Sequence, residues 1–177
     1  PVEAAEDPGQ IGFVDVVLVG VKAWQVSETA RTLAPLLGPD TFVVPLQNGV
    51  EAADQLAAVI GPERVLGGLC KIVSAIVAPG HVRHTGVPPR VEFGERDGRQ
   101  SERVERLRQA FARAQGLSVV VPDDVVAAIW EKFLFIAPVS GVGAVTRQPV
   151  GVMRAIPETR ALIERAMFEV AALARAK

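Results

Sequence analysis

The spacing of hydrophobic and polar residues divides the chain into two kinds of segment. Short runs rich in β-branched residues, without polar alternation, are typical of parallel strands that are buried on both faces. These runs occupy residues 13–21, 41–47 and 64–77. Between them, residues 24–37 and 51–61 carry apolar side chains at helical spacing. The resulting β-α-β-α-β order predicts an α/β fold with a parallel, doubly wound sheet.

Shorter elements follow this alternation. Two strand candidates at 81–85 and 90–94 lie close together in the chain, separated by glycine and proline. Such close spacing leaves no room for a crossover helix, so we expect them to extend the sheet in antiparallel fashion. A polar helix over 100–115 and a strand over 117–121 come next.

The pattern changes again at Pro122, after which the sequence predicts helices to the end of the chain. The only expected break lies in the segment "RQPVG" at 147–151. We therefore place a domain boundary near residue 122, with one domain over 1–121 and a second over 122–177. The chain opens without methionine and closes inside an amphipathic helix, so we expect a fragment of a longer protein.

Composition narrows the classes of function. Hydrophobic residues make up 49% and charged residues 22% of the chain, as in ordinary globular proteins. The net charge is -1 and no basic stripe is present, which gives nucleic-acid binding no electrostatic support. Uninterrupted apolar runs such as "VVLVGV" are too short to span a bilayer, so we expect no membrane partner.

Cysteine and histidine residues carry no clear chemistry. Cys70 is the single cysteine and cannot form an internal disulfide, which favours a reducing cytoplasm and a role as a small buried hydrophobe. His81 and His84 have no further ligand residues at suitable spacing, so the sequence predicts no metal site.

Lysine is scarce, which makes each lysine informative. The chain has four lysines against fifteen arginines, and Lys22 and Lys132 each lie two residues from one of the two tryptophans. Lys22 and Asn48 both follow predicted parallel strands, and ligands of open α/β sheets bind beyond the carboxyl ends of the strands. A purely structural alternative is that Asn48-Gly49 forms a turn.

Lys132 lies in the apolar segment "WEKFLFIAPVSG", which we expect to form a buried helix kinked by Pro138. A helix lysine usually extends its ammonium group to solvent. A desolvated lysine instead has a lowered pKa and can act as an acid at neutral pH, so Lys132 is a candidate for that role. The nearby Gly141-Val142-Gly143 follows no strand, and we interpret it as helix packing rather than a phosphate-binding loop.

Four stretches, taken together and in order, resemble ketopantoate reductase (2-dehydropantoate 2-reductase). They are "VLVGVKAWQV" (17–26), "VPLQNGV" (44–50), "SAIVAPGHVRHTG" (74–86) and "IWEKFLFIAPVSGVGAVTRQPVG" (129–151). The resemblance covers essentially the whole chain. It implies the C-terminal part of a Rossmann-type NADP-binding domain, followed by the start of an all-helical substrate and dimerisation domain. The family's glycine-rich loop and last helices would lie outside the chain.

The resemblance also implies roles for individual residues. Lys132 matches the lysine that hydrogen-bonds the substrate ketone and acts as general acid. Lys22 and Asn48 match residues that line the NADPH site, and Ala75 matches a backbone contact to the cofactor. Asn48 also matches a residue near the reacting carbon, and Ser140 could keep one hydrogen bond to the substrate.

Two positions depart from the family pattern. Ile136 and Val150 stand where well-known members carry substrate-binding asparagines, so we expect a less polar substrate pocket. The implied function is NADPH-dependent reduction of 2-dehydropantoate to pantoate, in pantothenate and coenzyme A biosynthesis, with a homodimer formed through the helical domain. Two alternatives stay open: a reductase of another branched or apolar 2-oxo acid, and a family member that binds a ligand without turnover. We expect the fragment by itself to be inactive.

Overall fold

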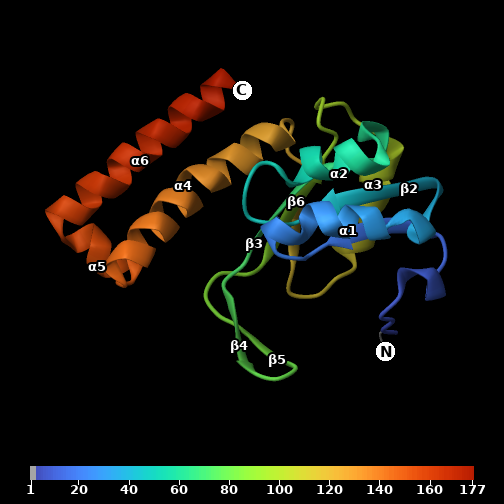
Figure 1. Cartoon of the computed structure of the whole chain (residues 1–177), viewed down its shortest axis with the longest axis horizontal. Helices are drawn as coiled ribbons and strands as arrows, with labels where there is room; N and C mark the ends of the chain where they lie inside the picture. The colour runs from blue at the N-terminus through green and yellow to red at the C-terminus, as the bar shows by residue number, and fades with distance from the viewer. Residues whose placement is uncertain (1–2) are drawn as a thin grey trace. The chain divides into compact units, whose positions relative to one another are not determined.

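The computed structural model describes residues 3–177, which form two compact units. The first unit comprises residues up to Gln47 together with Glu51–Val126, and the second comprises Asn48–Val50 and Ala127–Lys177. The expectation of an α/β sheet followed by an all-helical part is confirmed (Figure 1).

The first unit is built on strands that run in the predicted directions. Strand β1 (Val14–Val19) pairs in parallel with β2 (Leu37–Pro45). A parallel bridge between Val43 and Val65, with the Leu66 amide donating to the Val43 carbonyl at 3.0 Å, leads from β2 into β3 (Gly67–Lys71). The carboxyl ends of β1, β2 and β3 therefore lie at one edge of the first unit.

The antiparallel extension is present only in part, because the strand expected over 90–94 joins the sheet and the one expected over 81–85 does not. Strand β6 (Arg90–Gly94) pairs antiparallel with β3, and β7 (Ser118–Val120) pairs in parallel with β6. Two further strands, β4 (Ser74–Ala78) and β5 (His81–His84), form a separate antiparallel hairpin.

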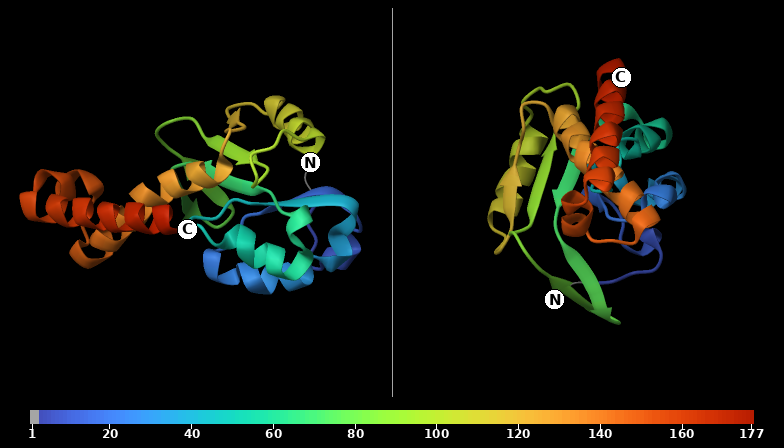
Figure 2. Two further views of the ribbon diagram at one scale, coloured as in Figure 1. Left: turned by 90° about the horizontal axis from the view of Figure 1, so that it is seen from above. Right: turned by 90° about the vertical axis from the view of Figure 1, so that its left-hand side faces the viewer.

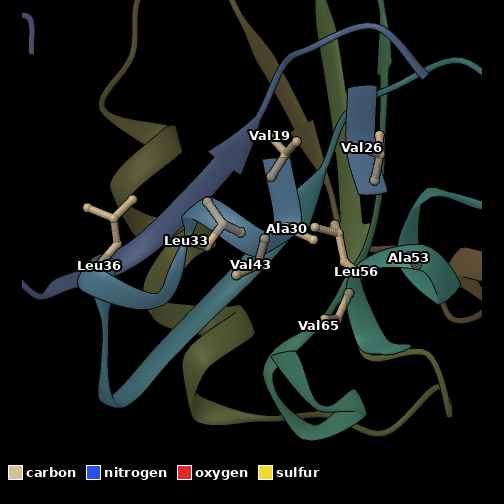
Figure 3. Close-up of a cluster of buried hydrophobic side chains, with 9 residues drawn as sticks. All are labelled: Val19, Val26, Ala30, Leu33, Leu36, Val43, Ala53, Leu56 and Val65. Carbon is tan, nitrogen blue, oxygen red and sulfur yellow. The ribbon is translucent and has the colours of Figure 1, made fainter. Parts of the chain in front are cut away.

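Helices cover both faces of these strands (Figure 2). Helices α1 (Val26–Thr32) and α2 (Ala52–Ile60) pack on one face over a core of aliphatic side chains (Figure 3). Helix α3 (Glu102–Ala112) packs on the other face, where Val104 and Leu107 contact a cluster that includes Phe93. Short 3-10 helices complete the unit: η1 (Pro8–Gln10), η2 (Ala23–Gln25), η3 (Ala34–Leu36) and η4 (Pro62–Arg64).

Two predicted elements are too long. The helix expected over 24–37 consists of η2, α1 and η3, because Pro35 has no amide hydrogen to continue the α-helical pattern. Leu37 belongs to β2, where it pairs with Val14. The strand expected over 64–77 ends at Lys71, because the chain leaves β6 there to form the hairpin.

The second unit contains three helices: α4 (Val125–Thr146, whose first two residues belong to the first unit), α5 (Val150–Ala155) and α6 (Pro157–Ala176). The break between α4 and α5 lies at the predicted place, and Arg147 there has a positive φ of 55°. The buried hydrophobic cluster of the second unit consists of Val142, Met153 and Ile163. Gly143 lies against Met153, in accord with the helix-packing interpretation of this glycine.

The expectation that "WEKFLFIAPVSG" is buried is wrong for most of its length. Helix α4 continues through Pro138, which is buried, but Phe135 is 55% exposed. The small cluster around Val142 covers only a narrow part of the helix surface. By length and composition α4 could also cross a membrane, and it is the single helix of this kind among residues 3–177. A single helix of this kind is weak evidence for membrane insertion.

Candidate functional site

The carboxyl ends of β1 and β2 are joined by hydrogen bonds. The Leu46 amide donates to the Val19 carbonyl at 3.0 Å, which continues the parallel pairing one residue past the end of β2. Lys22 follows β1 by three residues and its side chain is exposed. Its backbone N–H donates to the side-chain oxygen of Gln25 at 3.0 Å. The structure therefore places Lys22 at the edge where the sequence predicts a ligand.

Gln47 makes a further connection at this edge, one that sequence reasoning missed. The residue is 8% exposed, and its side-chain Nε2 donates to the carbonyls of Val19 at 2.8 Å and Val21 at 3.1 Å. Its Oε1 is buried and has no hydrogen-bond partner among the described residues. A hydrogen bond contributes about 0.5–1.5 kcal/mol, whereas an unsatisfied buried polar atom costs about 1–3 kcal/mol. The side chain therefore adds little net stability to the fold.

Asn48 and Gly49 come directly after Gln47 and belong to the second compact unit. Asn48 is exposed, and Gly49 adopts a φ of 113°, a conformation that side chains rarely allow. The chain bends over residues 48–50, in accord with the turn expected of an Asn-Gly pair. It does not exclude a ligand role, because an exposed amide after a parallel strand retains its hydrogen-bonding groups.

Lys132 and Ser140 lie on α4, in the same compact unit as Asn48. Lys132 and Ile136 are half-buried, whereas Ser140 is exposed. The spacing of four residues puts the three side chains on one face of the helix. This face offers one ammonium group, one hydroxyl group and a purely apolar side chain between them.

Ala75 lies in β4, at a backbone position paired with Arg83 of β5. Every residue of the two hairpin strands is exposed, including both histidines. The ring Nε2 of His84 lies 2.9 Å from the Val87 carbonyl oxygen. In the part of the chain that the structure describes, no cluster of three or more histidine, cysteine or carboxylate residues could hold a metal ion.

A charged group at the end of β3 was also not foreseen. The carboxylate of Glu92, with its side chain 3% exposed, pairs with Lys71 Nζ at 2.6 Å and Arg90 Nε at 3.0 Å. Lys71 is the last residue of β3 and Arg90 the first of β6, so this group lies at the same edge as Lys22. The two cations and one carboxylate leave a net positive charge there.

Comparison with known proteins agrees with this arrangement. A family model described as Ketopantoate reductase PanE/ApbA matches residues 1–98, and the model of its C-terminal part matches residues 124–177. The chain belongs to the ketopantoate reductase family. A solved 2-dehydropantoate 2-reductase from Geobacter metallireducens is 35% identical, with a TM-score of 0.88 over 96% of this chain and 56% of its own.

Curated relatives give the same result. A 2-dehydropantoate 2-reductase of Mesorhizobium japonicum is 33% identical over 98% of this chain and 59% of its own length. An uncharacterized oxidoreductase of Bacillus subtilis, YkpB, is 31% identical over 94% of this chain and 55% of its own length. The chain thus spans just over half the length of the ketopantoate reductase relatives that it matches.

Proposed function

We propose that the natural protein containing this chain is an NADPH-dependent ketopantoate reductase, which reduces 2-dehydropantoate to pantoate for pantothenate and coenzyme A biosynthesis in the cytoplasm. Family membership supports the reaction class. The observation that carries the mechanism is the presence of Lys132, half-buried on an apolar helix, in one compact unit with Asn48.

The cofactor would be held by groups at the carboxyl edge of the parallel strands. Lys22, exposed after β1, offers a positive charge to the cofactor, and Asn48 offers an amide. The backbone of Ala75 is a third candidate contact. These groups suit a polar, anionic ligand at an edge where open α/β sheets bind nucleotides. When bound, NADPH supplies the hydride that reduces the ketone carbon.

Lys132 would polarise the substrate ketone and supply the proton. As the C=O double bond of the 2-oxo acid becomes a C–O single bond, negative charge develops on oxygen. The ammonium group of Lys132 donates a hydrogen bond to that oxygen and then transfers a proton to it, which yields the 2-hydroxy acid and a neutral lysine. Solvent afterwards returns the proton to the lysine. Ser140 would donate a hydrogen bond to the substrate.

A second candidate substrate class follows from Ile136. Its half-buried hydrocarbon side chain lies on the face of Lys132 and offers no hydrogen bond. Val150, at the start of α5, likewise presents only carbon atoms. Both side chains favour a branched or apolar 2-oxo acid that has no hydroxyl group, in place of 2-dehydropantoate.

The test is steady-state NADPH oxidation by the full-length natural protein, followed by absorbance, with 2-dehydropantoate and a panel of branched and unbranched 2-oxo acids. The proposal expects the highest kcat/KM for 2-dehydropantoate. A higher value for an apolar 2-oxo acid would select the second class. Binding of NADPH without oxidation in the presence of every member of the panel would leave only a ligand-binding function.

Substitution of Lys132 tests the mechanism. Lys132→Ala removes both the charge and the proton donor, so we expect kcat to fall by a factor of about 10²–10⁴, with little change in the Kd for NADPH. Arg113→Ala is the control, since Arg113 is an exposed cation at the C-terminal end of α3, outside the compact unit that holds Lys132. A Lys132→Ala variant with wild-type kcat would remove this residue from the mechanism.

A further inference from the structure

We propose that Gln47 is a positioning residue, which fixes the loop after β1 so that Lys22 is held in place for the cofactor. This inference rests on the proposed function, because Lys22 is taken there as a cofactor contact. Gln47 itself is buried and is not assigned any contact with the ligand.

The hydrogen bonds of Gln47 are directed at the residues that set the course of this loop. Its Nε2 donates to the carbonyls of Val19, the last residue of β1, and Val21, the residue before Lys22. Gly20 lies between these two residues, and a Cβ atom there would meet no other atom within 4 Å. Glycine has no Cβ atom, so the backbone can adopt many conformations at this residue. The side-chain amide of Gln47 joins the residues on either side of this glycine through its two hydrogen bonds.

Lys22 is thus held from both directions along the chain. Before it, the Val21 carbonyl accepts from Gln47 Nε2 at 3.1 Å. After it, Gln25 Oε1 accepts from the Lys22 backbone N–H at 3.0 Å. The backbone of Lys22 is fixed by these two glutamines while its ammonium group stays exposed. A flexible lysine side chain gains from such an arrangement, because less freedom is lost when the ligand binds.

Among the described residues, the unsatisfied oxygen of Gln47 leaves its amide with little net stabilising effect. A methionine has a similar shape and could fill the same space without leaving a buried acceptor unpaired. The fold alone therefore gives little reason to keep an amide at residue 47. The two hydrogen bonds to the loop are what methionine could not supply.

The experiment uses Gln47→Met in the full-length protein. We expect the Tm to stay within about 3 °C of wild type, since the lost hydrogen bonds and the removed orphan oxygen offset each other. The Kd for NADPH should rise about tenfold through the loosened loop, while kcat at saturating NADPH changes less than about threefold. Gln55→Met is the control: this half-buried glutamine of α2 contacts Ser27, and its loss should leave the Kd unchanged.

A double-mutant cycle separates positioning from general destabilisation. If Gln47 acts through Lys22, then Gln47→Met should weaken NADPH binding far less in a Lys22→Ala background than in wild type. Equal effects in both backgrounds would overturn the proposal. So would a large fall in Tm accompanied by an unchanged Kd at a temperature where the variant is folded.

Hydrogen exchange gives a readout that does not depend on the cofactor. Amides of residues 20–25 should exchange faster in Gln47→Met than in wild type, while those of α2 stay unchanged. Unchanged exchange in residues 20–25 would refute the positioning role. Failure of the proposed function would show itself differently, as a wild-type protein that neither binds NADPH nor reduces a 2-oxo acid.

Discussion

The side chain of Glu95 is 4% exposed and is held by the guanidinium group of Arg103, with Nε at 2.7 Å and Nη2 at 2.6 Å. Burial by itself would raise the pKa of Glu95. Hydrogen bonds from Arg103 and Ser101, with the charges of Arg103 and Arg99, outweigh burial and hold the pKa below its usual value of 4.5. The sequence could not reveal this pair, because it depends on how the end of β6 meets α3.

The pH dependence of stability should report this ion pair. The folded state lowers the pKa of Glu95, so its contribution is complete above pH 4.5 and is lost as the pH falls through the folded-state value. We expect Glu95→Gln to lower the free energy of unfolding by about 2 kcal/mol at pH 7. The difference from wild type should shrink in denaturant titrations below pH 4.5. A difference that is constant from pH 7 to pH 3 would contradict this assignment.

Site residues were predictable to different degrees. Lys22 and Asn48 could be singled out because each follows a strand whose β-branched pattern is visible in the sequence. Gln47 could not, because its role depends on which backbone carbonyl groups its amide meets, one at the end of β1 and one in the loop after it. The ion pairs of Glu92 could not be predicted either, because its partners Lys71 and Arg90 belong to different strands.

At the scale of elements, two glycines let β3 lie close to its neighbours: Gly68 faces β2, and Gly67 faces the first residue of α4. A Cβ atom on Gly68 would lie 2.5 Å from the Pro45 carbonyl oxygen, and one on Gly67 would lie 2.5 Å from Cγ1 of Val125. Neither contact can be relieved easily, since the first neighbour is backbone and the second is a buried, branched side chain. The sequence shows the glycine pair but not which strand lies against it.

Substitution of Gly68 tests this packing. Gly68→Ala should lower the free energy of unfolding by about 2–3 kcal/mol, because the new methyl group forces β2 and β3 apart. Gly20→Ala is the matched control, since its Cβ would meet nothing and its φ is not positive. That change should alter stability by no more than about 1 kcal/mol. Equal urea midpoints for the two variants would argue against the close approach.

At the scale of the whole molecule, buried hydrophobic side chains are divided unevenly between the two compact units. The first unit has two clusters of buried side chains, one on each face of its strands, whereas the second unit has one cluster of three residues. The sequence pattern predicted the helices of the second unit and the break after α4, but not the second break at Ile156, where α5 ends and α6 begins at Pro157. It could not predict how exposed α4 is, because burial depends on neighbouring elements and not on the composition of the helix itself.

Hydrogen exchange of the 177-residue chain should reflect this difference between the units. Amides of α5 and α6 should exchange at least about tenfold faster than those of β1, β2 and β3, because few buried contacts oppose local opening in the second unit. Mass spectrometry of peptic peptides would measure both rates in one sample. Equal protection in the two units would show that the small cluster around Met153 is more stabilising than its size implies.

The exposure of the β4–β5 hairpin bears on how freely its sequence and length can change during evolution. All residues of its two strands are exposed, so no core packing constrains their identity or the length of the ribbon. Its tip, Pro79–Gly80, joins the two strands at the end of the ribbon. Substitutions and insertions can accumulate there at little cost to the fold. Evolution can thus modify a segment that carries Ala75 without disturbing the sheet from which it projects.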